Sequence, residues 1–147
     1  MDKKNKKYFL ITILALMMSA VCFAGSYSNP TFAKRLPQPA KVFIKEKFHN
    51  ATIVSAKREV DAYVCRLNNG IEIEFNLKGV WLKIDGSVRT ALPASVIPFN
   101  INKYVKENYP EFDITEIEKG RYGYKVELSN KRNLKFNHQG KFIGKNH

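Results

Sequence analysis

The fold is decided by residues 63–81, YVCRLNNGIEIEFNLKGVW, which recur 61 positions later at residues 124–142 as YKVELSNKRNLKFNHQGKF. The same offset places residues 36–83 on residues 97–144 without a gap. The identities are Pro37/Pro98, Lys45/Lys106, Glu46/Glu107, Ile53/Ile114, Tyr63/Tyr124, Leu67/Leu128, Asn69/Asn130, Phe75/Phe136, Asn76/Asn137 and Gly79/Gly140. Internal repetition at a fixed period indicates copies of one structural unit. The sequence therefore predicts a duplicated fold, and what the copies share is mainly core and turn chemistry.

Each copy is predicted to begin with a helix that has one apolar face. Pro37 and Pro39 can open a helix but cannot continue one. Apolar residues then recur at helical spacing, which predicts a helix that covers a sheet. These residues are Ala40, Phe43, Ile44 and Phe48 in the first copy and Ile101, Tyr104, Val105 and Tyr109 in the second. A first strand is expected at residues 53–57, and its counterpart at residues 114–118.

Two hairpins follow in each copy, and their turns predict the strand register. A three-residue loop at residues 68–70, ending in a left-handed Gly70, pairs Leu67 with Ile71, Cys65 with Ile73 and Tyr63 with Phe75. All these pairs are apolar, whereas a two-residue turn would mix the two faces of the sheet. The next hairpin closes in the same way around Gly79 and sets Phe75 opposite Trp81, as Gly140 sets Phe136 opposite Phe142. Lys131 stands where Gly70 stands, so that one turn is expected to be strained or slightly different.

The register gives the predicted sheets a core face and a charged face. Antiparallel sheets often leave one face in water, and this charged face is the candidate binding surface. A merely solvated face is the alternative, because scattered apolar surface residues are normal. The candidate contact residues are Val64, Arg66, Val80 and Leu82 in the first copy and Lys125, Lys135 and Lys141 in the second.

These observations predict an α+β fold of two tandem repeats, each a helix packed on a roughly four-stranded antiparallel meander. The expected organisation is a signal peptide at residues 1–24, a flexible leader at 25–35, the first repeat at 36–84, a linker at 85–96 and the second repeat at 97–147. Because the linker is short and contains Leu92 and Pro93, the two repeats are expected to share one continuous body.

The repeated order of residues resembles a known family. In each copy a Leu-Pro or Ile-Pro pair precedes the helix, followed by Tyr63-x-Cys65-x-Leu67 or Tyr124-x-Val126-x-Leu128, and then by Phe-Asn-x-x-Gly-x-Trp/Phe at residues 75–81 and 136–142. This order is similar to the PepSY-like family of exported bacterial proteins, which are described as similar to β-lactamase-inhibitor protein. The resemblance covers residues 36–144 and implies tandem α+β units in the bacterial envelope. The inhibitor grips an enzyme with a concave sheet, and related PepSY domains are thought to regulate peptidases, but no inhibitory motif carries over to this sequence.

The first 24 residues are typical of an export signal. They combine a basic start, an apolar run at residues 8–20, and small residues at Cys22 and Ala24. The run is short for a membrane span, and cleavage after Ala24 or Ala20 would leave a periplasmic or secreted protein with no membrane span. Lipidation at Cys22 is an alternative, although the residues before it depart from the usual lipoprotein context.

The full chain carries a formal net charge of +12. Positive charge favours anionic partners, but these lysines are scattered in the manner of a solvated surface. Nucleic-acid recognition would need clustered cations with stacking aromatic residues, so no nucleic-acid partner is predicted. Cys65 is the only cysteine that follows the predicted signal peptide. It is expected to be a buried structural thiol, since free cysteine is among the most buried residue types.

Enzymatic activity is not predicted. His49, His138 and His147 do not recur between the copies. The sequence contains no nucleophile elbow, phosphate loop or paired metal-ligand motif, so no cofactor and no metal are expected. Glu72 and Glu74 are interpreted as salt-bridge partners rather than calcium ligands.

The function predicted is therefore an exported, non-enzymatic binding module, which binds or inhibits an envelope protein or peptide through the charged sheet face. The alternative is a binder of a small ligand or an anionic envelope component in a cleft between the repeats. A structural subunit is a third possibility. The oligomeric state is not predicted.

Overall fold

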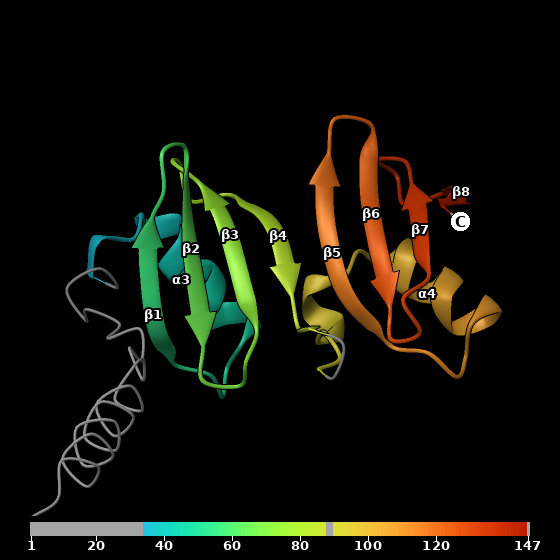
Figure 1. The fold of residues 1–147 in the computed structure, drawn as a ribbon, viewed down its shortest axis with the longest axis horizontal. Helices are drawn as coiled ribbons and strands as arrows, with labels where there is room; N and C mark the ends of the chain where they lie inside the picture. Colours follow the sequence, from blue (N-terminus) through green and yellow to red (C-terminus); the bar gives the residue numbers. More distant parts are fainter. Residues whose placement is uncertain (1–33, 88–89, 147) are drawn as a thin grey trace, which may run out of the picture.

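A computed structural model of the chain describes residues 34–87 and 90–146, and its eight strands form one antiparallel sheet in the order β1 to β8. Helices α3 and α4 lie on the same face of this sheet (Figure 1). The predicted signal peptide and nearly all of the predicted leader lie outside the described residues. The elements are α3 (Gln38–Lys47), β1 (Ile53–Arg58), β2 (Ala62–Leu67), β3 (Glu72–Asn76), β4 (Trp81–Asp85), the 3-10 turn η3 (Ala94–Val96), α4 (Phe99–Asn108), β5 (Ile114–Gly120), β6 (Gly123–Leu128), β7 (Asn133–Phe136) and β8 (Phe142–Asn146).

The two helices begin directly after Pro37 and Pro98, as the sequence predicted. Pro37 and Pro98 are the N-cap residues of α3 and α4, each with φ of −53°. The predicted apolar faces are confirmed, since Ala40 and Ile44 are buried on α3 as Ile101 and Val105 are on α4. Burial of such a stripe, rather than intrinsic propensity, is what stabilises helices this short.

The predicted register of the first hairpin is confirmed. The Leu67 amide donates to the Ile71 carbonyl at 2.8 Å, and Cys65 lies opposite Ile73. Gly70 has φ of 86°, and Lys131, which replaces it in the second half, has φ of 67°. Lys131 therefore adopts the left-handed conformation despite its side chain, which costs about 1–2 kcal/mol for an L-residue.

The second hairpin of each half rests on the start of a helix. The Asn76 side chain oxygen accepts hydrogen bonds from the amides of Lys78 and Val80, both at 3.0 Å, and closes the turn. Gly79 follows with φ of 81°, and a Cβ there would lie 2.9 Å from the Ala40 nitrogen. Gly140 meets α4 in the same manner, since its Cβ would lie 2.9 Å from the Asn100 Cβ. These glycines serve both the turn and the close approach of the helix.

The core lies between the sheet and the helices. One row of cross-strand neighbours runs through six strands and has no exposed surface: Cys65, Ile73, Ile84, Ile117, Val126 and Leu134. Burial, together with the charge of Glu72, raises the pKa of the Cys65 thiol to about 12. The thiol is therefore protonated and inaccessible, as expected for a structural cysteine.

The two halves meet at the pairing of β4 with β5. Ile84 lies opposite Ile117, and Lys83 lies opposite Glu118, so the sheet continues across the middle of the molecule. The strands therefore form a single eight-stranded antiparallel sheet, in one continuous body. The segment predicted as a linker contributes to the core, because Leu92 and Val96 are each only 6% exposed.

Candidate functional site

The sheet face opposite the helices is not covered by α3 or α4 (Figure 1), and we call it the open face. Because successive side chains of a strand point to opposite faces, the neighbours of the buried row belong to this face. Two rows of cross-strand partners run along it. The first row is Lys57, Val64, Glu74, Lys83, Glu118, Lys125, Lys135 and Gly144, and the second is Ser55, Arg66, Glu72, Asp85, Glu116, Glu127 and Asn133.

A β-bulge in the last strand of each half changes the predicted alternation. Glu74 lies opposite Lys83 while Phe75 lies opposite Trp81, so Leu82 is an extra residue in β4. Ile143 is the corresponding extra residue in β8. Strict alternation from Trp81 would turn Lys83 toward the helices, whereas the bulge brings Lys83 to the open face and Ile84 to the core. Bulges of this kind re-aim side chains.

The middle of the open face is acidic. Glu72, Asp85, Glu116 and Glu127 are successive partners on β3, β4, β5 and β6. Glu72 is paired with Arg66 at 2.9 Å, as expected for a salt-bridge partner, and Glu127 is paired with Lys131 at 3.0 Å. Three cations thus pair with the four carboxylates, because Glu116 and Asp85 share Lys83. Most of these pairs are exposed enough to contribute little to stability.

Lys83 links the two halves through this acidic row. Its ammonium lies 2.9 Å from the Glu116 carboxylate on β5 and 3.5 Å from Asp85 on its own strand. Partial burial opposes the charge, but the hydrogen bonds and charges of Glu116 and Asp85 outweigh it and raise the pKa of Lys83. An ion pair between β4 and β5 therefore reinforces the short seam of the sheet.

The candidate residues of the first half lie on β2 and at the start of β4, with β3 between them. Val64 and Arg66 lie on β2, where Arg66 is paired with Glu72. Val80 precedes β4 and is 48% exposed, and Leu82 is the half-buried bulge residue. Apolar surface is thus available on this half of the open face beside an ion pair.

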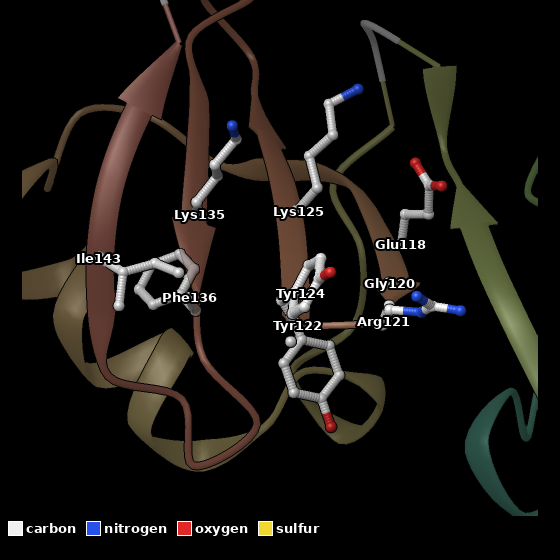
Figure 2. A pocket seen from close by; sticks show the side chains of 10 residues that line it. Glu118, Gly120, Arg121, Tyr122, Tyr124, Lys125, Lys135, Phe136 and Ile143 are labelled. Atoms are coloured by element: carbon white, nitrogen blue, oxygen red, sulfur yellow. The ribbon is translucent and has the colours of Figure 1, made fainter.

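Lys125 and Lys135 lie opposite each other on β6 and β7. They border a groove of about 380 Å³ (Figure 2). Lys141 does not join them. It precedes β8 and lines a different groove, beside Asn100 and Tyr104 of α4. The structure therefore divides the three predicted lysines between two places.

Other residues of the groove that Lys125 and Lys135 border were not among the predicted contact residues; they include Glu118, Arg121, Tyr122, Tyr124 and Ile143. Arg121 and Tyr122 form the turn between β5 and β6, and Tyr122 is 78% exposed. A turn has no hydrophobic periodicity, so only its composition could have indicated them: an arginine and a tyrosine between Gly120 and Gly123. At Gly123 a Cβ would overlap the Phe136 carbonyl oxygen, so this glycine allows β6 to start close to β7.

An aromatic cluster lies beside this groove at the junction of the halves. The rings of Trp81 and Tyr124 are 6.4 Å apart, and the Lys119 ammonium lies 3.7 Å from the centre of the Trp81 ring. Burial lowers the pKa of Lys119, and the face of an indole ring is a favourable environment for a cation. Trp81 is the single tryptophan of the chain, so its fluorescence reports on this junction.

The described residues contain no group of three or more His, Cys, Asp and Glu side chains that could hold a metal ion. His49 and His138 are exposed, and the His138 ring nitrogen is 2.9 Å from the Arg121 carbonyl oxygen. Within residues 34–87 and 90–146, no helix is both long and apolar enough to cross a membrane. His147 lies outside the described residues.

Comparison with known proteins gives three similar solved structures. A "putative calcium-regulated periplasmic protein" from Bacteroides thetaiotaomicron shares 36% identity with a TM-score of 0.72, and the alignment covers 78% of this chain and 92% of that one. Two proteins from Bacteroides vulgatus, each described as a "putative periplasmic protein", share 36% and 32% identity with TM-scores of 0.70; the alignments cover 78% of this chain and 92% and 94% of those.

A comparison with curated proteins gives no match. The family described as "Putative beta-lactamase-inhibitor-like, PepSY-like" matches residues 29–72 and 61–144. These segments span nearly all of the described chain, and they confirm the resemblance carried by the repeated Tyr, Phe, Asn and Gly positions. The chain is therefore a member of the PepSY-like, beta-lactamase-inhibitor-like family.

Proposed function

We propose that this protein is an exported, non-enzymatic module that binds a protein or peptide of the bacterial envelope through its open face. The observation that carries the proposal is the continuity of this face over eight paired strands, with both helices on the opposite side. Its ordered rows of charge and its half-buried apolar residues offer a partner both polar and apolar contacts. This surface is also the one that a sheet-gripping inhibitor would use.

The open face is large enough for a specific interface. Eight strands at a spacing of about 4.8 Å span roughly 34 Å, and five residues along a strand span about 17 Å. The resulting projection of roughly 600 Å² approaches the ~800 Å² that each partner buries in a standard protein complex. Turns at the ends of the strands supply the remainder, so no further domain is needed to form the interface.

The proposed contact residues are Val64, Arg66, Val80 and Leu82 in the first half, with Lys125 and Lys135 in the second. Lys141 is left out of the contact set, because it lines the groove beside α4. Val64 and Leu82 supply the apolar contacts, which contribute most of the free energy in the centre of an interface. Arg66 and the lysines supply orientation through charge.

Export and duplication complete the proposal. Residues 1–24 are proposed to act as a signal peptide, and the similar solved structures are described as periplasmic proteins. The two halves are proposed to be tandem repeats at residues 36–84 and 97–147. The starts of α3 and α4 at residues 38 and 99, and the bulges at residues 82 and 143, all differ by the 61 positions of the sequence repeat.

The alternative of a ligand cleft between the repeats gains no support, because β4 and β5 are paired where such a cleft was expected. Calcium is named only in the description of one similar solved structure. On the open face of this chain, Glu72 and Glu116 are paired with cations. Calcium is therefore a variable of the experiment below rather than part of the proposal.

The experiment captures partners from an envelope extract with the protein purified after export. The parent is compared with the Val64→Asp/Leu82→Asp variant and with a matched control, Val42→Asp/Val60→Asp. Val42 and Val60 are 41% and 94% exposed and lie on α3 and in the β1–β2 turn. All variants are first shown to be folded by circular dichroism, and each capture is made with and without calcium.

A protein held by the parent and the control but lost by the open-face variant would support the proposal. Equal recovery by all three proteins, or recovery by none, would contradict it. Recovery that requires calcium in every variant would move the binding site away from the proposed contact residues.

A further inference from the structure

Lys125 and Lys135 form a like-charge pair on the open face, with Glu118 as the nearest carboxylate across the strands. They are direct partners on adjacent strands, where Cβ atoms lie about 4.5–5.5 Å apart and like charges are destabilising. Elsewhere on the open face Arg66, Lys83 and Lys131 each lie within about 3 Å of a carboxylate. Within the described part of the chain, neither Lys125 nor Lys135 forms an ion pair, although Glu118 is the cross-strand partner of Lys125.

The space around the two lysines is open. Lys135 lies opposite Gly144 on β8, and a Cβ at Gly144 would meet nothing within 4 Å. The two side chains leave neighbouring strands side by side and extend in the same direction (Figure 2). A single carboxylate with two oxygens can therefore approach both ammonium groups from solvent.

Apolar surface lies at the other end of the groove from the lysine ammonium groups (Figure 2). Ile143, the bulge residue of β8, is 56% exposed, and Tyr122 in the β5–β6 turn is 78% exposed. Arg121 adds a third cation at this turn. The groove thus combines three cations and one carboxylate, Glu118, with an exposed aliphatic and an exposed aromatic side chain. A free inorganic anion would make no use of the two apolar side chains.

We propose that this groove, formed by Arg121, Tyr122, Lys125, Lys135 and Ile143, binds an acidic side chain of a partner protein whose neighbouring residue is aromatic or aliphatic. This inference rests on the proposed function and names the chemistry of the segment that is recognised. The carboxylate lies between Lys125 and Lys135, and its apolar neighbour packs on Tyr122 or Ile143. Exposed charge pairs are individually weak, so the apolar contact is required for a useful affinity.

Binding of an acidic segment would give the like-charge pair a role. A partner carboxylate removes the repulsion between the two ammonium groups at the moment of binding. The pair therefore weakens the free protein and strengthens the complex, which gives specificity for acidic segments over neutral ones.

The test uses fluorescently labelled peptides and the full exported protein. The acidic peptide is Gly-Glu-Phe-Glu-Leu-Gly, and its neutral counterpart is Gly-Gln-Phe-Gln-Leu-Gly. Binding is followed by fluorescence anisotropy for the parent, for Lys125→Gln/Lys135→Gln and for the control Lys45→Gln/Lys78→Gln. Lys45 and Lys78 are exposed, on α3 and in the β3–β4 turn, so the control has the same net charge as the groove variant.

The parent is expected to bind the acidic peptide about tenfold more tightly than the neutral one, the size that two exposed charge pairs reach together. The groove variant loses this difference, and the control keeps it. The groove variant should also unfold at the same or a higher temperature than the parent, because the like-charge contact is gone. A lower unfolding temperature would make the two lysines structural and overturn the proposal.

Equal affinity for both peptides, or an equal loss in the control, would also overturn it. Inorganic phosphate at matched ionic strength is added as a competitor, and full displacement of the peptide by phosphate would mean a simple anion site. An envelope protein that is lost on Val64→Asp/Leu82→Asp but retained on Lys125→Gln/Lys135→Gln would keep the proposed function and reject the groove. The two proposals can thus fail separately.

Discussion

Replacing Gly79 with alanine is expected to destabilise the protein by about 2–3 kcal/mol, whereas the same change at Gly70 costs about 1 kcal/mol. Both glycines have a left-handed backbone, with φ of 81° and 86°. They differ in what a new Cβ meets. At Gly70 it meets nothing within 4 Å, whereas at Gly79 it lies 2.9 Å from both the Ala40 nitrogen and the Pro37 Cβ.

The magnitudes follow from two separate effects. An L-residue in the left-handed region costs about 1–2 kcal/mol, and the lower entropy of the unfolded alanine chain returns about 0.4–1 kcal/mol of this. Gly70→Ala therefore measures the net effect of the left-handed backbone and the unfolded-state entropy alone, because its Cβ meets no neighbour. Gly79→Ala adds the overlap with the first turn of α3, and overpacking of this kind costs typically about 1–3 kcal/mol.

Urea unfolding measures both variants, with the fluorescence of Trp81 and the far-ultraviolet circular dichroism as independent probes. At a typical slope of about 1–3 kcal/mol/M, Gly79→Ala should lower the unfolding midpoint by roughly 1 M more than Gly70→Ala does. Gly140→Ala serves as an internal repeat of the test, because its Cβ would lie 2.9 Å from the Asn100 Cβ. Equal midpoints for Gly70→Ala and Gly79→Ala would refute the argument that the hairpin rests on the helix.

Three further changes test the core, the thiol and the seam. Ile117 lies at a central position with no exposed surface. Ile117→Ala should therefore lower the free energy of unfolding by about 2–5 kcal/mol. A loss below about 1 kcal/mol in calorimetry would show that the position is not in the core. Burial and the charge of Glu72 raise the pKa of Cys65 from 9.0 to about 12. The folded protein therefore favours the protonated thiol, and this contribution to the free energy of unfolding is complete below pH 9 and is lost as the pH rises toward 12. The parent should therefore lose up to about 4 kcal/mol over this window that Cys65→Val does not lose, and parallel pH profiles of unfolding would contradict the assignment. Lys83→Gln should lower the free energy of unfolding by less than about 1 kcal/mol, because the side chain is 35% exposed, and the loss should shrink in 1 M salt; a loss that salt leaves unchanged would mean that the pair with Glu116 acts through packing.

The helices and hairpins could be predicted because their signals are local. Pro37 and Pro98 open helices, and the Asn and Gly residues of the turns at Gly70 and Gly79 leave only one register in which all apolar residues share a face. The predicted strand partners are confirmed. The first strand of each half begins at the predicted residue, 53 or 114, and runs on to residue 58 or 120. Lys131 shows the limit of such rules, since hairpin geometry there overrides the preference of a residue that lacks the freedom of glycine.

The remaining features depend on contacts that local patterns do not encode. The extra residues Leu82 and Ile143 look like ordinary strand residues in the sequence, so the bulges that bring Lys83 to the open face could not be predicted. Pairing of β4 with β5 joins strands separated by a helix and a loop. The groove combines a turn, at Arg121 and Tyr122, with residues of two strands, and only the folded sheet brings them together.

The buried pair at the seam, Ile84 and Ile117, has sequence counterparts at the two outer edges of the sheet. Counting 61 positions from Ile84 leads to Lys145, and counting back from Ile117 leads to Ala56; these residues lie on the outermost strands, β8 and β1. If a second molecule added its β1 to β8, as β5 adds to β4, Lys145 would occupy the place that Ile84 holds in the core. Burying that unpaired ammonium group would oppose the junction. Lys145 is therefore expected to disfavour edge-to-edge pairing of two molecules through β8 and β1.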